Sequence, residues 1–397
     1  MIDVKYKKIY DEFVDHYKNI HINPWHEISE DELEKIYHSL INSMDINNDY
    51  NFKYFMDYII KRLSGTSDAH TKYDSVSFIP MNFRMFNNDI LVNFPQCLKN
   101  SKLVSINGVE ISTIILELED VVTYGTLGKR KYELEKALFN KCILFGLPSL
   151  RNCNELVFEI ESIDGQKITK TFDKTTQYSK EELFDYDQYR YGQNATYQFF
   201  DHCLIYTHSS VQMKFKDDME RAIYQLRNED LTDIDTIIID IRGNTGGNSS
   251  LNSILMNFLS EHRDKKLICL TDYRVFSGGR FALRDLIHLG AITIGEEIGT
   301  PINCYGNSNW VNIDGYWFSI SECYFHPFIG WSASSKEEFQ KEATPELLSS
   351  SIFHPDILIE ETEEDYIQGI DTVLNYALEY SRTMIKKENE TRIEFKR

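Results

Sequence analysis

The chain has 397 residues, of which 42% are hydrophobic and 13% aromatic, and this composition excludes a disordered or fibrous protein. Its formal net charge of −20 argues against a duplex nucleic-acid binder, because phosphate recognition relies on clustered Lys and Arg. No apolar run approaches the roughly 20 residues of a membrane-spanning helix, and the charged N-terminus is unlike a secretory signal. We therefore expect a cytoplasmic protein with no membrane or nucleic-acid partner, and its length favours two or three domains.

The first 75 residues have the patterns of a helical segment. Ser29 and Glu32 form a capping-box pair, and apolar residues between 52 and 63 repeat the spacing of one helix face. We therefore expect a helical N-terminal segment over residues 1–75, after which the pattern changes to short strands.

Residues 76–175 have the pattern of short β segments and turns. The Asn107-Gly108 pair favours a tight hairpin, and a second turn is expected at Asp164-Gly165. Residues 176–200 then become polar and Tyr-rich, which is typical of a linker or a flap.

Residues 201–380 alternate between strand and helix, which predicts right-handed βαβ units in an α/β core. The strand from Thr236 to Asp240 carries β-branched residues in succession, as expected for a strand that is covered on both faces. The last residues, 381–397, form a charged tail.

A glycine-rich turn follows the Thr236 strand and contains the adjacent glycines Gly246 and Gly247. Without a Cβ, these residues allow backbone N–H groups to face a small anion or a developing oxyanion. A phosphate-binding loop would need Lys and then Ser or Thr after the last glycine, but Asn248 follows it. No HExxH motif or pair of His and Cys with ligand spacing indicates a metal centre.

Two further residues could supply catalytic chemistry. Ser277 lies at a strand-to-helix turn, where a serine can act as a nucleophile or simply cap the helix. His70 lies in a short polar loop, where a histidine can act as a general base or serve a structural role.

Five stretches resemble, in the right order, motifs of the C-terminal processing (tail-specific) and tricorn-core serine peptidase family. They are Asp68–Thr71, Ile239–Gly247, Phe276–Gly278, Gly295-Glu296 with Tyr305-Gly306, and Pro355–Ile357 with Asp371. The resemblance extends from about residue 63 to the end of the chain. It implies a crotonase-like or Clp-protease-like α/β core with a PDZ-like β-rich domain over residues 76–175, in addition to the helical N-terminal segment.

The same resemblance implies a serine peptidase that acts on peptides or unfolded proteins and needs no cofactor. Ser277 would be the nucleophile and His70 the base. The family's alternative base is a lysine, and no lysine occurs between residues 267 and 335. Gly246 or Gly247, together with Gly278, would supply the N–H groups of an oxyanion hole.

The chain also departs from the family pattern, which leaves the third member of a triad unassigned. Ala69 and the run 349–351 stand where tricorn-type relatives have a serine and a glutamate. Glu296 either orients the base or braces its turn, and Glu342 or Glu346 could be brought into the site instead. Two alternatives to a peptidase are a catalytically silent binding protein on the same fold and, more remotely, an enzyme of acyl-CoA chemistry.

Overall fold

The computed structural model describes residues 1–394 apart from 76, 88, 179–193 and 350. Two compact units are present: unit 1 comprises Met1–Asp185 and Asn303–Ser351, and unit 2 comprises Tyr186–Ile302 and Ile352–Arg397. Most of the expected flap at 176–200 lies outside the described residues. None of the helices in the described ranges is both long and apolar enough to cross a membrane.

Unit 1 begins with three helices, as the sequence predicts: α1 (Val4–Ile20), α2 (Glu30–Ser43) and α3 (Asp49–Ser64). The capping box at the start of α2 is confirmed, because the Ser29 side chain accepts from Glu32 N–H and the Glu32 carboxylate accepts from Ser29 N–H. Helix α3 ends at Gly65, whose φ of +52° is disfavoured for residues with a Cβ.

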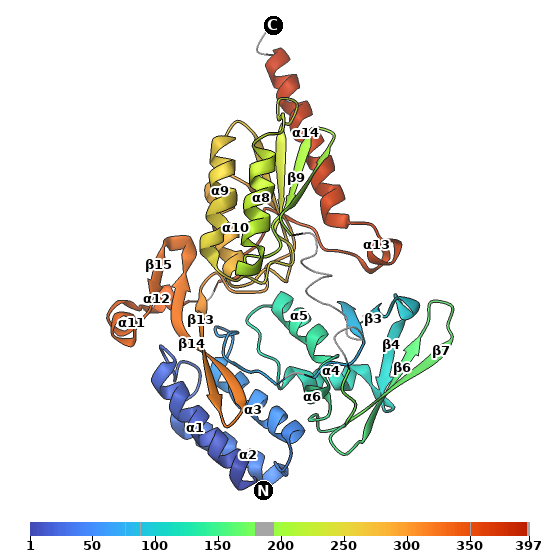
Figure 1. Ribbon diagram of the computed structural model, residues 1–397, viewed down its shortest axis with the longest axis vertical. Helices are drawn as coiled ribbons and strands as arrows, with labels where there is room; N and C mark the ends of the chain where they lie inside the picture. The colour runs from blue at the N-terminus through green and yellow to red at the C-terminus, as the bar shows by residue number, and fades with distance from the viewer. Residues whose placement is uncertain (76, 88, 179–193, 350, 395–397) are drawn as a thin grey trace. The chain divides into compact units, whose positions relative to one another are not determined.

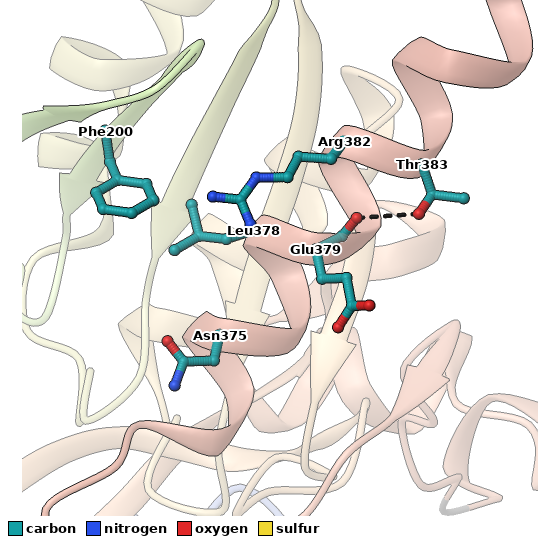
Figure 2. Close-up of a pocket in the computed structure, with 6 residues that line it drawn as sticks. All are labelled: Phe200, Asn375, Leu378, Glu379, Arg382 and Thr383. Carbon is teal, nitrogen blue, oxygen red and sulfur yellow. Dashed lines mark hydrogen bonds between the residues drawn. The ribbon is translucent and has the colours of Figure 1, made fainter.

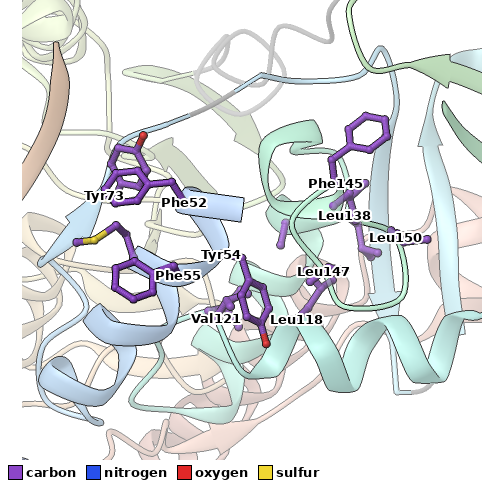
Figure 3. Packing of buried hydrophobic residues seen from close by; sticks show 14 of the residues in the cluster. Phe52, Tyr54, Phe55, Tyr73, Leu118, Val121, Leu138, Phe145, Leu147 and Leu150 are labelled. Carbon is purple, nitrogen blue, oxygen red and sulfur yellow. The ribbon is translucent and has the colours of Figure 1, made fainter. Parts of the chain in front are cut away.

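The core of unit 1 is built around α3, and Figure 3 shows part of it. Phe52, Phe55, Ile59 and Leu63 are fully buried, as their one-face spacing predicts. Aromatic pairs add to the packing, among them Phe52 and Tyr73, whose ring centroids lie 5.8 Å apart.

Between residues 76 and 175 the structure has the predicted β segments but also helices that the sequence pattern did not indicate. Its sheet has the order β2-β3-β4-β6-β7, with β5 beside β4. The hairpin at Asn107-Gly108 is confirmed, and both residues have positive φ, as a tight turn of this kind requires. The strands are β2 (Asn82–Phe86), β3 (Asp89–Phe94), β4 (Lys102–Ile106), β5 (Val109–Glu110), β6 (Glu155–Glu161) and β7 (Lys167–Asp173).

The sequence pattern predicted only β segments and turns here, and this prediction was wrong for residues 111–144. This part contains α4 (Ile111–Glu119), α5 (Leu127–Ala137) and α6 (Lys141–Leu144). A β-branched run at the start of α4 is typical of a strand, but Ile114 and Leu118, four residues apart, are both fully buried on one helix face. Tertiary packing of that face therefore overrides local β propensity.

A second sheet of unit 1 contains β1 (Lys72–Tyr73), β13 (Cys304–Ile313), β14 (Tyr316–His326) and β15 (Trp331–Ala333). Strand β14 lies between β1 and β13 and also pairs with β15. The sheet packs on α1, where Phe13 and Phe318 have ring centroids 4.8 Å apart. Two short helices follow, α11 (Lys336–Glu342) and α12 (Pro345–Leu348).

Unit 2 has the predicted α/β alternation. Its sheet has the order β16-β12-β11-β10-β9-β8, and all neighbours are parallel except β8. The strands are β8 (Thr196–Phe200), β9 (Cys203–Thr207), β10 (Thr236–Asp240), β11 (Lys266–Thr271), β12 (Ile292–Gly295) and β16 (Ile357–Leu358).

Helices cover both faces of this sheet. Helices α8 (Lys216–Leu226), α9 (Asn252–Glu261) and α10 (Gly278–His288) lie on one face, and α14 (Thr372–Glu394) lies on the other (Figure 1). The short α13 (Glu363–Gln368) precedes α14. Successive residues Ile237, Ile238 and Ile239 of β10 are all 0% exposed, which confirms a strand buried on both faces.

Candidate active site

Ser277 lies at the junction between the loop after β11 and the first residue of α10. Its backbone has φ 51° and ψ −117°, a conformation that costs a residue with a Cβ about 1–3 kcal/mol. An ordinary N-cap serine, such as Ser29, is extended and accepts a hydrogen bond from its helix, whereas the Ser277 side chain makes no capping bond. Ser277 is thus held at a sharp, strained turn between a strand and a helix, as the nucleophile of a serine hydrolase often is.

The glycine turn after β10 is in direct backbone contact with the Ser277 turn. A Cβ built on Gly246 would lie 2.4 Å from Gly278 N and 2.8 Å from Ser277 Cβ. A Cβ on Gly278 would lie 2.9 Å from Gly247 O. Phe276 N–H also donates to Asn244 O at 2.9 Å. Two motifs that are thirty residues apart in the sequence therefore form one compact structure, and only glycine fits at its contacts.

The backbone N–H groups of the three glycines, Gly246, Gly247 and Gly278, differ in their hydrogen bonding. Gly246 N–H donates to Asn244 Oδ1 at 3.0 Å, so it is taken up within the turn. Gly278 is the first residue of α10, and an N–H at that position has no acceptor within its helix. Within the described parts of the chain, neither Gly247 N–H nor Gly278 N–H donates a hydrogen bond.

Glu296 lies just after β12 and ties together two loops of unit 2. Its Oε2 accepts from Tyr273 N–H at 3.4 Å, and its Oε1 accepts from Glu361 N–H at 3.3 Å. Its backbone pairs with Thr271, at the end of β11. These bonds brace the loop that leads from β11 to Ser277.

His70 lies in unit 1, in the loop between α3 and β1. Its Nδ1 is 3.0 Å from Tyr305 O on β13. A carbonyl oxygen can only accept, so Nδ1 carries the proton of the neutral ring and Nε2 carries the basic lone pair. A Cβ on Gly306 would lie 3.3 Å from His70 Cε1, so a glycine lets the ring lie close against the strand. This tautomer is the one in which Nε2 can accept a proton.

Asp68 anchors the loop that carries His70. It is fully buried, and its Oδ1 accepts from the N–H groups of His70 and Thr71, both at 3.0 Å, and from Ser321 Oγ at 2.6 Å. Its Oδ2 is 3.1 Å from His21 Nε2. Burial by itself would raise the pKa of Asp68, but these hydrogen bonds hold that pKa well below its usual range.

Sequence patterns gave no indication of His21 or Ser321. Each meets Asp68 only through folding, from the end of α1 and from β14 respectively. Asp68 itself lies within the Asp-x-His-Thr motif, which is the one signal in the sequence that a supporting group stands beside His70.

The other candidate acidic residues lie on the surface of unit 1. Glu342 Oε2 accepts from Trp331 Nε1 at 3.2 Å, and Glu346 is exposed in the first turn of α12. Of the predicted site residues, Ser277, the three glycines and Glu296 belong to unit 2, where Ser277 and the glycines are in contact. His70 belongs to unit 1.

A groove of about 510 Å³ opens elsewhere on unit 2, between the end of β8 and α14. Figure 2 shows its lining, in which the Arg382 side chain extends toward Leu378 and Phe200, whereas Glu379 points away from them. It contains none of the predicted site residues, and its lining offers no activated nucleophile.

No family model matches the chain, and no curated protein matches it. Among solved structures, mature CPAF is 10% identical, with a TM-score of 0.59, over 91% of this chain and 94% of that one. A CPAF mutant is 9% identical, with a TM-score of 0.63 and the same coverage. The photosystem II D1 C-terminal processing protease is 9% identical, with a TM-score of 0.41, over 90% of this chain and 94% of that one.

The chain is therefore similar in fold to CPAF over nearly its whole length. At the level of the fold, this similarity agrees with the α/β class expected from the sequence.

Proposed function

We propose that the chain is a serine endopeptidase that cleaves peptides or unfolded proteins, with Ser277 as the nucleophile. The observation that carries this proposal is the strained backbone of Ser277, which is locked in place by glycine-only contacts with the turn after β10. Strain of this kind persists only where the surroundings impose it, and it is concentrated at functional sites. A serine that merely capped α10 would need neither the strain nor the glycine turn.

In the proposed mechanism, Ser277 Oγ attacks the scissile carbonyl while His70 Nε2 accepts its proton. His70 then returns that proton to the leaving amine, and a water molecule repeats the sequence to release the acyl group. The bond from Nδ1–H to Tyr305 O supports this role, because it fixes the tautomer and the orientation of the ring. The carbonyl dipole of Tyr305 also favours the imidazolium that forms during the reaction.

We assign the oxyanion hole to the N–H groups of Gly247 and Gly278. Gly246 shapes the turn, since its own N–H is bonded to Asn244. Each donor that points at the oxyanion contributes roughly 3 kcal/mol to transition-state stabilisation. The position of Gly278 at the N-terminus of α10 adds the positive end of the helix dipole to this site.

Glu296 has two candidate roles, orienting the base and bracing the nucleophile loop. Its hydrogen bonds to Tyr273 N–H and Glu361 N–H favour the bracing role. In place of a carboxylate on the ring, we propose that the Tyr305 carbonyl orients His70.

The finer description of the fold is also a proposal. The parallel sheet of unit 2, with helices on both faces, supports a crotonase-like or Clp-protease-like core. The five-stranded path of β2, β3, β4, β6 and β7 supports a PDZ-like domain over residues 76–175.

Cleavage of an unfolded, fluorescently quenched protein such as casein tests the proposal. We expect Ser277→Ala and His70→Ala to lose activity by roughly four to six orders of magnitude, as in other serine peptidases. Ser250→Ala, which removes an exposed serine near the glycine turn, is the matched control and should retain activity. A folded wild-type protein that cleaves no unfolded substrate, or an active Ser277→Ala variant, would count against the proposal and would favour a silent binding protein.

A further inference from the structure

We propose that His21 is a positioning residue for the base His70, and that it acts through the buried carboxylate of Asp68. This inference rests on the proposed function for its effect on catalysis. Its structural part, that His21 fixes the loop of residues 67–71, stands on contacts within unit 1 alone.

The hydrogen bonds of the His21 ring show which nitrogen donates to Asp68. His21 follows α1, is 0% exposed, and its backbone N–H donates to Tyr17 O. Its Nδ1 accepts from Asn23 N–H at 3.1 Å, so this nitrogen carries no proton. The ring proton is therefore on Nε2, which donates to Asp68 Oδ2 at 3.1 Å.

Asp68 connects His21 to the backbone of the loop that carries His70. Its other oxygen accepts from the N–H of His70 and the N–H of Thr71, so the carboxylate sets the backbone conformation on which the His70 ring is carried. Without the His21 donor, Oδ2 would be a buried charged oxygen with one strong partner fewer. The carboxylate would then rotate, take up a proton or admit water, and each of these changes loosens the His70 loop.

The same N-terminal segment supports the second contact of the base. Asn23 Nδ2 donates to the Tyr305 hydroxyl at 3.1 Å, and the Tyr305 ring packs on His21 with centroids 4.9 Å apart. Tyr305 is the residue whose carbonyl holds His70 Nδ1. Residues 21–23 thus contact both groups that orient His70, namely Asp68 and Tyr305.

His26 packs against His21 and adds no charge to this group of residues. Its ring stacks on His21 with centroids 5.1 Å apart, and its Nδ1 is 2.9 Å from Asn23 O. Its Nε2 also lies 3.3 Å from Ser64 O, and both carbonyls favour the protonated ring. Burial outweighs them and lowers the pKa of His26 to about 4, so the ring is neutral at the pH at which a histidine base works. His26 therefore adds no positive charge beside Asp68. The Asp68 carboxylate, and that of Glu27, which accepts from Ser67 Oγ at 3.4 Å, both favour the imidazolium formed during catalysis.

Two substitutions of His21 separate its two hydrogen bonds. In His21→Gln the side-chain amide reaches the position of Nε2 and keeps a donor to Asp68. In His21→Asn the shorter side chain keeps an acceptor near the position of Nδ1, for Asn23 N–H, but has no donor that reaches Asp68. The two variants are similar in polarity and both lose the ring, so they form a matched pair.

Three readouts test the proposal on the full-length protein. In His21→Asn, hydrogen exchange of the peptide that contains residues 67–71 should accelerate at least tenfold, and the rate of labelling by a fluorophosphonate probe should fall roughly ten- to a hundredfold. With a peptide substrate, kcat should fall while KM stays within about twofold. His21→Gln should remain within about threefold of the wild type in each measurement. A purely structural role would instead lower global stability in both variants.

The outcomes distinguish this inference from the proposed function. If the wild type reacts with no fluorophosphonate, the proposed function fails, and hydrogen exchange of the loop still decides whether His21 fixes it. If exchange and labelling in His21→Asn match those of the wild type, the inference is overturned while the peptidase proposal stands. Should His21→Asn not fold, His21→Phe replaces it, because its ring preserves the packing on Tyr305 and lacks any donor.

Discussion

Gly246→Ala is expected to be far more disruptive than a glycine-to-alanine change at a similar backbone angle elsewhere in unit 2. Gly246 has φ +97°, and an alanine in the left-handed region costs about 1–2 kcal/mol. The new Cβ would also lie 2.4 Å from Gly278 N and 2.9 Å from Phe276 O, which are backbone atoms that cannot swing away. Forcing such a contact typically costs a further 1–3 kcal/mol. The total expected loss in the free energy of unfolding is therefore about 2–5 kcal/mol.

Gly290→Ala is the matched control, because it isolates the cost of the backbone angle. Gly290 has φ +89°, and a Cβ built there meets no atom within 4 Å. Its substitution should cost only the free energy of placing an alanine at a positive φ, about 1–2 kcal/mol. The two variants should thus differ by about 1–3 kcal/mol, which is the cost of the contact with the Ser277 turn.

Urea denaturation followed by circular dichroism at 222 nm measures both losses. Tryptophan fluorescence would not serve, because Trp25, Trp310, Trp317 and Trp331 all lie in unit 1. Labelling by a fluorophosphonate should also fall at least a hundredfold in Gly246→Ala, since the Gly278 donor is displaced, and stay near the wild-type rate in Gly290→Ala. Equal loss of stability in the two variants, with labelling retained in both, would refute the close contact between the two turns.

Three further outcomes follow from contacts elsewhere in the structure. Phe55→Ala should lower the free energy of unfolding by about 3–5 kcal/mol, because Phe55 is fully buried, whereas Phe199→Ala, at 42% exposure, should change it far less; chemical denaturation measures both. Burial alone would raise the pKa of Asp371, but hydrogen bonds from Arg242 lower it. The ion pair of Asp371 with Arg242 therefore stabilises the fold above about pH 4, and this stabilisation is lost as the pH falls through the lowered pKa. The difference in denaturation midpoint between the wild type and Asp371→Asn should accordingly shrink from pH 7 to pH 3. Gly306→Ala should slow labelling about tenfold with little loss of stability, because its Cβ would press on His70 Cε1 at 3.3 Å; an unchanged labelling rate would contradict the placement of the ring.

The compact structure formed by the Ser277 turn and the glycine turn was predictable because its signals are local in the sequence. A β-branched run indicates a buried strand, a glycine pair after it indicates a turn with accessible N–H groups, and a serine directly before a helical pattern indicates a strand-to-helix turn. The contact between the turns follows from parallel strands β10 and β11, which end at the same edge of the sheet. The strain at Ser277 could not be predicted, because a positive φ at a serine depends on the packing around it.

The contacts that hold the His70 loop were not predictable, because they come from residues that are far apart in the sequence. His21 is 47 residues from Asp68, and Ser321 is 253 residues from it. Neither residue lies in a motif, and a single histidine after a helix has no pattern that distinguishes it from the other ten in the chain. The helices between residues 111 and 144 were missed for a related reason, since burial of one face decided their structure against local propensity.

Mapping the covalent adduct of a fluorophosphonate probe by peptide mass spectrometry tests the central claim most directly. The proposed mechanism predicts a single modified residue, Ser277, with no adduct in Ser277→Ala and a strongly reduced rate in His70→Ala. A folded wild-type protein that stays unmodified, or an adduct on a residue other than Ser277, would contradict it.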